Sequence, residues 1–207
     1  MNKTRLEALS DGVFSIAMTL LIIDVTVPHL GEVSDGAILD ALTHLIPVIV
    51  SYFVSFIVLA MFWISHNYFY EAITKNINRI LTLINILFLS LIAFIPFSAH
   101  LIGAYPTSRV AVMLYGFNIL LIASSQFAAL LYAMKSDELH TEHVSRRLKI
   151  QATLRNGLTL GGTLLGIMFA SLGFLSFAIF LYGLPIFFNL IPGLLDALER
   201  SLGLRFD

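Results

Sequence analysis

Residues 5–24 read Arg-Leu-Glu-Ala-Leu-Ser-Asp-Gly-Val-Phe-Ser-Ile-Ala-Met-Thr-Leu-Leu-Ile-Ile-Asp. The segment is long and apolar enough to cross a bilayer, yet it contains polar side chains at Ser10, Asp11, Ser15 and Thr19. An ionisable side chain at membrane depth costs about 3 kcal/mol or more, so it usually faces protein or water and marks a functional site. We therefore interpret this segment as the wall of an ion pathway, held in place by the rest of the chain.

The composition is that of an integral membrane protein. Of the 207 residues, 58% are hydrophobic and 12% are charged, whereas a soluble domain has about 45–50% apolar and about 25% charged residues. The mean hydropathy is +0.89, and the charges are too few to cover a soluble surface of this size. The formal net charge of −1 gives no basic surface for nucleic acid. The absence of cysteine excludes disulfides, thiol nucleophiles and Cys-based metal sites.

The apolar segments predict an all-α membrane protein. A spanning helix needs about 20 mostly apolar residues, and six segments qualify. We predict a single six-span domain over residues 1–207, with spans at about 6–27, 45–69, 79–101, 109–134, 150–172 and 174–195. Pro28 ends the first span, and we expect residues 29–43 to form a polar, acidic loop. Gly173 predicts a tight turn between the last two spans.

The distribution of Lys and Arg predicts the orientation in the membrane. With six spans both termini lie on one side, and of the 12 Lys and Arg residues all except Arg109 fall on that side. Loops on the cytoplasmic side carry the excess of Lys and Arg. We therefore predict a multi-pass plasma membrane protein with both termini in the cytoplasm.

Polar residues from three predicted helices fall at a similar depth. Ser10 and Asp11 lie in the inner third of the first span, Trp63 and His66 share a face near the inner end of the second, and Asn85 lies about two turns into the third. The indole, imidazole and carboxamide groups can donate hydrogen bonds to a carboxylate. For Asp11 we favour a structural interhelix network over direct handling of ions or protons and over interfacial exposure. Trp63, taken alone, fits an interfacial anchor better.

One sector of the first helix carries bulky aliphatic side chains and one hydroxyl. At 100° per residue, this aliphatic stripe consists of Ile16, Thr19, Leu20 and Ile23. Asp11 points to a different side of the helix. Such a stripe is more often plain lipid- or protein-facing surface than a pore lining. Asp24, at the outer end, could attract cations to a pore mouth or pair with Arg109.

The first helix also carries a family resemblance. Arg5-x-x-x-Leu9-Ser10-Asp11 and the Gly-Val-Phe-Ser-Ile-Ala-Met-Thr-Leu-Leu-Ile-Ile-Asp that follows it resemble the signature of the prokaryotic transmembrane protein 175 family of potassium channels. The family pattern is Arg-x-x-x-Phe-Ser-Asp, so this chain departs from it at Leu9. Phe62-Trp63-x-x-His66 and Asn85 also resemble family features, and the resemblance extends over essentially the whole chain.

The resemblance implies a homotetramer in a prokaryotic membrane, with four copies of the first helix around a central pore. It implies that Ile16, Leu20 and Ile23 form a hydrophobic constriction and that Thr19 adds a ring of hydroxyls near which potassium passes, without a fixed metal site. The family lacks a carbonyl-lined filter, and no Thr-Val-Gly-Tyr-Gly occurs here. Selectivity would then depend on pore diameter, ion hydration and Thr19. The predicted function is a passive, potassium-selective cation channel.

Two other functional classes are alternatives to a channel. A proton-coupled secondary transporter would use Asp11 and His66 as a relay, but the sequence has no inverted repeat or matched pair of interrupted helices. An enzyme would need a nucleophile or metal motif beside them, and there is no Walker-type loop; we predict neither catalysis nor a cofactor. His140, Glu142 and His143 could suggest a metal site, but no further ligand lies nearby, which favours a solvated linker.

Overall fold

The computed structural model describes residues 2–27, 29–31, 33–136, 139 and 146–190, without the side chains of Asp24 and of residues 184–190. Within these ranges the chain is helical and forms no strand, which confirms the all-α prediction. The elements are α1 (Lys3–Leu20), η1 (Leu21–Asp24), α2 (Asp35–Tyr68), η2 (Phe69–Ile73), α3 (Arg79–Ala93), α4 (Ile95–Ala104), α5 (Arg109–Lys135), α6 (Arg146–Ser171) and α7 (Leu175–Leu190).

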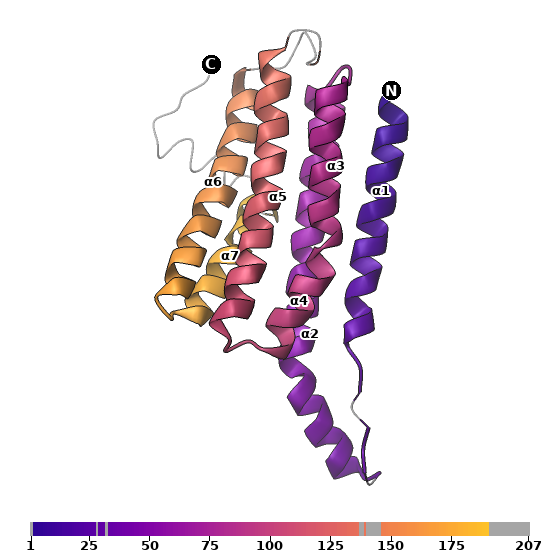
Figure 1. The fold of residues 1–207 in the computed structure, drawn as a ribbon, viewed down its shortest axis with the longest axis vertical. Helices are drawn as coiled ribbons and strands as arrows, with labels where there is room; N and C mark the ends of the chain where they lie inside the picture. Colours follow the sequence, from indigo (N-terminus) through magenta and orange to yellow (C-terminus); the bar gives the residue numbers. More distant parts are fainter. Residues whose placement is uncertain (1, 28, 32, 137–138, 140–145, 191–207) are drawn as a thin grey trace.

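The long helices run alongside one another in a bundle, and α1 lies at one edge of it (Figure 1). Helix α1 packs on α3 and α2, α2 packs on α4, and α5 packs on both α3 and α6. Helices α6 and α7 pack together at the opposite edge. The beginning of α2 projects beyond the other helices. Because α1 has neighbours on one flank only, its other flank is left uncovered in a single subunit.

Four helices begin at a residue that caps them. Ser and Asn side chains accept a hydrogen bond from a free N–H group of the first helical turn. Asn2 accepts from the Thr4 amide at 3.1 Å, and Asn78 accepts from the Leu81 amide at 2.9 Å. Ser34 and Ser108 cap α2 and α5 in the same way. These polar residues fix where each apolar helix starts.

The predicted loop over residues 29–43 is wrong beyond Ser34, because α2 already begins at Asp35. The Ser34 hydroxyl caps the helix, and the Asp35 carboxylate in the first turn is stabilised by the positive end of the helix dipole. Helix α2 continues through Pro47. A proline inside a helix removes one backbone hydrogen bond, and the following apolar residues carry the helix on.

The predicted third span, residues 79–101, is kinked near its middle. Helix α3 ends at Ala93 and α4 begins at Ile95, with Phe94 between them. Pro96 has no N–H group and cannot donate the hydrogen bond that would join the two helices. The Phe94 amide instead donates to the Leu91 carbonyl at 3.2 Å. The two helices together still form one stretch long enough to cross a membrane.

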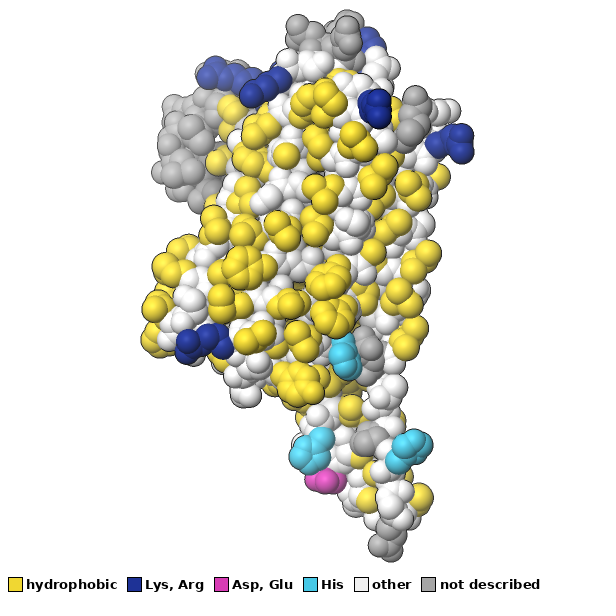
Figure 2. Space-filling view, in the orientation of Figure 1, with side chains coloured by type: hydrophobic (Ala, Val, Ile, Leu, Met, Phe, Trp, Pro, Cys, Tyr) yellow, Lys and Arg dark blue, Asp and Glu magenta, His cyan; other side chains and the backbone are white. Residues whose placement is uncertain are grey.

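Four helical stretches within the described residues are long and apolar enough to cross a bilayer: Lys3–Ile23, Asp35–Ile73, Arg79–Ala104 and Arg109–Lys135. On the face in Figure 2, hydrophobic side chains cover the middle of the molecule, and most Lys and Arg side chains lie toward one end. A multi-pass membrane fold is therefore confirmed. The count of six spans stays a prediction, because α6 and the described part of α7 do not meet the same criteria.

The glycines of α6 differ in what they face. A Cβ atom on Gly166 would stand 2.5 Å from Cε1 of Tyr182, so this glycine admits the tyrosine ring. Gly157 and Gly161 face open space, with no described atom within 4 Å of such a Cβ. Gly173 forms the α6–α7 turn at φ +94°, a conformation that favours glycine. Close packing against a neighbouring helix is therefore seen at Gly166 but not at Gly157 or Gly161.

Candidate pore and interhelix network

One face of α1 is buried against its neighbours. Its members follow the three- and four-residue spacing of a helix face: Leu6, Ser10, Phe14, Ala17 and Leu21. Phe14 lies 6.0 Å from the His66 ring and 5.9 Å from the Phe88 ring, measured between centroids. This face fixes the rotation of α1, and thereby decides which of its residues point away from the subunit.

Three polar side chains link α1, α3 and α2 inside this packed face. Asn85 Nδ2 donates to Ser10 Oγ at 3.2 Å, and His66 Nε2 lies 2.7 Å from Asn85 Oδ1. Ser10 Oγ donates in turn to the Leu6 carbonyl at 2.9 Å. All three side chains are buried. We call this chain of contacts the buried network; it joins three residues that the sequence placed at a common depth.

The imidazole of His66 is held by aromatic rings as well as by Asn85. Its ring stacks on Phe88, with centroids 5.2 Å apart and planes 9° apart, and lies 4.7 Å from the ring of Tyr70. Because the Asn85 carboxamide oxygen can only accept, His66 Nε2 carries the hydrogen. His66 Nδ1 is buried and has no hydrogen-bond partner among the described residues. The surroundings of His66 are those of a neutral, structural histidine.

Asp11 and Trp63 form a separate contact at the subunit surface. Trp63 Nε1 donates to Asp11 Oδ1 at 2.9 Å, and the Trp63 side chain is 38% exposed. Asp11 is also exposed, and within the described part of the chain it makes no hydrogen bond to His66 or Asn85. The predicted cluster is thus divided: Ser10, His66 and Asn85 share the buried network, and Asp11 pairs with Trp63 beside it.

Lys3 links α1 to the end of η2, a contact that the sequence did not predict. Its Nζ donates to the carbonyl oxygens of Tyr70 and Thr74, the latter at 2.8 Å, and lies 3.8 Å from Glu7. Carbonyl groups at a helix end lack helical partners, and a lysine can satisfy them. The only feature of the sequence that marks Lys3 is its position at the end of a long apolar span. A lysine at such a position is ordinarily interpreted as lying at the membrane interface, so the sequence gives no reason to expect these hydrogen bonds.

The aliphatic stripe lies on the uncovered flank of α1. Ile16 is 60% exposed, Leu20 is 42% exposed and Ile23 is 63% exposed, and Thr19 is exposed as well. A single subunit thus leaves a row of large apolar side chains exposed on the helix at the edge of the bundle. Exposed apolar patches of this kind mark contact with lipid, protein or a ligand path.

The Thr19 hydroxyl is oriented by its own helix. Its Oγ1 lies 2.9 Å from the Ser15 carbonyl oxygen and 3.0 Å from the Ile16 carbonyl oxygen, and donates to them. Because the hydroxyl proton is directed at the backbone, the lone pairs of the oxygen stay open on the exposed flank. Thr19 can therefore present an acceptor oxygen to whatever passes this face.

The remaining predicted residues are Arg5, Asp24 and the alternative metal site at residues 140–143. Arg5 is exposed near the beginning of α1, and the side chain of Asp24, together with any pairing to Arg109, lies outside the described residues. Residues 140–143, the alternative metal site, also lie outside them. In the part of the chain that the structure describes, no group of three or more His, Asp or Glu side chains could hold a metal ion.

Residues 5–96 match the model of a family described as the endosomal/lysosomal potassium channel TMEM175. A potassium channel of Streptomyces collinus is 34% identical over 128 residues, which are 59% of this chain and 61% of that protein. A potassium channel of Chamaesiphon minutus is 33% identical over 122 residues, 58% of this chain and 60% of that protein. The chain thus aligns with about three fifths of the length of these curated relatives.

Two further similarities extend the comparison. The endosomal/lysosomal proton channel TMEM175 of Gallus gallus is 36% identical over 111 residues, 51% of this chain and 22% of that protein. The crystal structure of a lysosomal potassium-selective channel TMEM175 homolog from Chamaesiphon minutus superposes with a TM-score of 0.77 at 27% identity. That match covers 91% of this chain and 96% of the other, so the fold is shared over nearly its whole length. All of these proteins are named as ion channels, which supports the prediction that the chain is not an enzyme.

Proposed function

We propose that this chain is a member of the TMEM175 family and the subunit of a passive, potassium-selective cation channel in the plasma membrane of a prokaryote. The bacterial relatives named as potassium channels support the choice of ion. The four apolar spanning stretches support the membrane setting. Both termini would lie in the cytoplasm, in keeping with the distribution of Lys and Arg.

The observation that carries the proposal is the uncovered flank of α1. One side of this helix is fixed by packing and by the buried network, and the other exposes Ile16, Leu20 and Ile23. Four copies of the chain arranged around a common axis would cover this flank and bring four stripes together. The pore of the resulting homotetramer would be lined by α1.

In such a pore the stripe would act in two ways. Rings of Ile16, Leu20 and Ile23 would form a hydrophobic constriction that can empty of water in a closed state. A ring of Thr19 hydroxyls would offer oxygens to partly dehydrated potassium ions, since the proton of each already points at its own helix. Asp24, at the end of η1, would add negative charge at one mouth and raise the local concentration of cations.

Reconstitution into liposomes tests this function. We expect vesicles loaded with potassium to lose it down its gradient when a proton ionophore balances the charge, with slower flux for sodium and none for a large organic cation. Flux that saturates and depends on an imposed proton gradient would instead establish the transporter that uses Asp11 and His66. Proton flux without ionophore is measured in parallel, because the relative of Gallus gallus is named as a proton channel.

A pair of matched variants connects the flux to the stripe. Ile23→Ala widens the proposed constriction, so we expect faster potassium flux or weaker discrimination against sodium. Ile64→Ala makes the same change at a residue of α2 that is 50% exposed but lies outside the stripe. Equal behaviour of the two variants in single-channel current and in the permeability ratio would contradict the proposed position of the constriction.

A further inference from the structure

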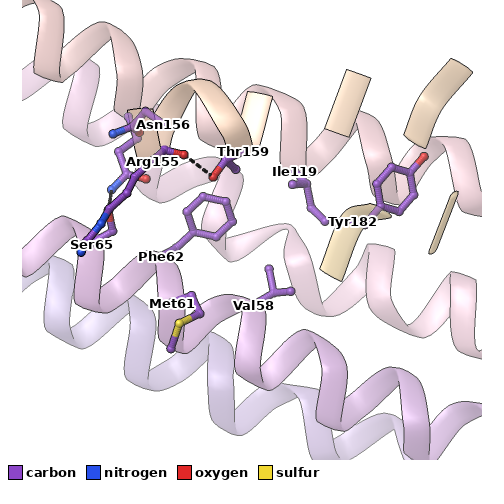
Figure 3. A pocket seen from close by; sticks show the side chains of 10 residues that line it. Val58, Met61, Phe62, Ser65, Ile119, Arg155, Asn156, Thr159 and Tyr182 are labelled. Carbon is purple, nitrogen blue, oxygen red and sulfur yellow. Dashed lines mark hydrogen bonds between the residues drawn. The ribbon is translucent and has the colours of Figure 1, made fainter. Parts of the chain in front are cut away.

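A groove lies between α2, α4, α5 and α7, near the end of the bundle where α2 begins to project. It has about 260 Å³ of free space and is partly open to the surroundings. The hollow beside Phe62 and Arg155 (Figure 3) has only about 30 Å³, which is room for little more than one water molecule. The groove, unlike that hollow, is large enough for a molecule other than water.

The walls of the groove are mostly apolar. The lining residues that carry no polar side-chain group are Pro47, Val50, Val54, Ile102, Pro106 and Ile179. Pro47 and Val50 are exposed and form its rim, whereas Ile102 is buried and forms part of its floor. An apolar cavity of about 150 Å³ already admits benzene, so the groove has room for a segment of hydrocarbon.

The hydroxyl groups in the groove are already engaged with the protein. Ser51 Oγ donates to the Ala99 carbonyl at 2.7 Å, and Ser55 Oγ and Tyr115 Oη share a hydrogen bond at 3.1 Å. Among the described residues that line the groove there is no Asp, Glu, Lys, Arg or His. Because no charge and no unpaired hydroxyl awaits a partner there, the groove favours hydrocarbon over a polar ligand.

The groove lies at the level where hydrocarbon begins. The stretch Arg109–Lys135 has 27 residues and is about 40 Å long, close to the thickness of a bilayer with its headgroups. Tyr115 lies about 9 Å from the Arg109 end of α5, and Ile179 lies about 6 Å from the beginning of α7. At this depth the headgroups give way to acyl chains, so the medium around the groove is lipid.

A second copy of the chain is the alternative occupant, and the position of the groove argues against it. None of the described residues that line the groove belongs to α1. In the proposed assembly, a premise taken from the proposed function, the copies meet along the uncovered flank of α1. The groove is then separate from the contact between copies. An empty groove would forfeit dispersion contacts along its walls, and lipid chains are at hand to supply them.

We propose that this groove binds one acyl chain of a phospholipid from the leaflet on the Arg109 side of the membrane. The chain enters past Pro47 and Val50 and lies against Val54 and Ile102. It supplies contacts that α2, α4 and α7 do not give one another at this level. It thereby supports α2 at the point where this helix leaves the bundle, at a site separate from the stripe and from the buried network.

Photolabelling of the full chain in lipid vesicles tests this inference. The vesicles contain a phosphatidylcholine with a diazirine on one acyl chain, which on illumination forms a carbene that inserts into neighbouring bonds. Peptide mass spectrometry then locates the adducts. We expect adducts at Ile102 and Tyr115, which are 6% and 3% exposed, because only a chain inside the groove reaches them. Adducts at Leu121, which is 52% exposed outside the groove, report ordinary contact with lipid.

A matched pair of variants connects the adducts to the groove. Val54→Trp fills the groove and should remove most of the adducts at its floor while those at Leu121 stay. Val110→Trp makes the same change at a residue of α5 that is 72% exposed and does not line the groove, so all adducts should stay. If Val54→Trp does not yield folded protein, Val50→Trp replaces it, because Val50 is 54% exposed and a larger side chain there covers the rim.

Two results would overturn the inference. The first is the absence of adducts at Ile102 and Tyr115 while Leu121 is labelled; a lower oligomer yield of Val54→Trp in that case would identify a second copy as the occupant. The second is equal labelling of the floor in the groove variant and in Val110→Trp. Labelling is measured without ion flux, so its outcome is distinguishable from a failure of the proposed channel function.

Discussion

Asn85→Ala should weaken the subunit more than an ordinary buried polar substitution, because Asn85 is the centre of the buried network. The change removes the bond to Ser10 at 3.2 Å and the bond to His66 at 2.7 Å. It leaves His66 without a partner on either ring nitrogen, since Nδ1 already has none among the described residues. Side-chain hydrogen bonds between membrane helices contribute about 0.6 kcal/mol on average and at most about 1.7 kcal/mol. Two such bonds predict a loss of about 1–3 kcal/mol.

The assay is reversible unfolding of the purified chain in mixed micelles, with Asn118→Ala as the matched control. Asn118 is equally buried, but donates one bond only, to Ser98 at 3.1 Å, so its loss should cost about half as much. A double-mutant cycle with Ser10→Ala should give a coupling energy of about 0.5 kcal/mol or more. Equal costs for the two asparagine variants, or no coupling to Ser10, would show that the network does not hold α1 in place.

Four further outcomes are expected. Asp11→Ala should lower oligomer yield and thermal stability while the potassium-to-sodium permeability ratio of the assembled protein stays unchanged; normal yield and stability would exclude a structural role for Asp11. Trp63→Phe keeps an aromatic ring but loses the N–H group that donates to Asp11, so the free energy of unfolding should fall by about 1 kcal/mol. In a chain that already carries Asp11→Ala, Trp63→Phe should cause no additional loss of stability. Gly166→Ala places a methyl group against Tyr182 and 3.2 Å from the Ala178 carbonyl, so the free energy of unfolding should fall by about 1–3 kcal/mol. Gly161 faces open space, so Gly161→Ala should leave the free energy of unfolding unchanged or raise it by up to about 1 kcal/mol. Lys3→Gln should lower the free energy of unfolding by about 1 kcal/mol, because the carbonyls of Tyr70 and Thr74 lose a cationic donor. An unchanged thermal unfolding midpoint would show that water replaces the lysine as the donor.

The helices and their approximate order could be predicted because apolar length alone identifies a membrane span. The residues at which the helices begin and end could not be predicted in the same way, because each helix end depends on a single polar residue or a proline. Ser34 followed by Asp35 is a helix-start signal, but it lies within an acidic stretch that resembles a loop. The break at Phe94 depends on Pro96, and the average hydrophobicity of a segment does not reveal such a break.

The grouping of polar residues by depth anticipated Ser10, His66 and Asn85, because their positions along three antiparallel spans fix a common level. It did not separate Asp11 from that group. Asp11 follows Ser10 by one residue, so the two side chains point about 100° apart on the helix, and only the packing of α1 decides which of them is buried.

The position of the pore can be tested by cysteine accessibility, because the chain contains no native cysteine. Single cysteines are placed at Ile16, Thr19 and Ile23 of the stripe and, as matched controls, at Ala17 and Leu21 on the buried face of the same helix segment. A cationic thiol reagent is added while potassium current is recorded. We expect rapid block at the three stripe positions, slower when potassium is raised, and none at the controls. Block at Ala17 and Leu21 with no effect at Ile16, Thr19 and Ile23 would show that ions do not pass the exposed flank of α1.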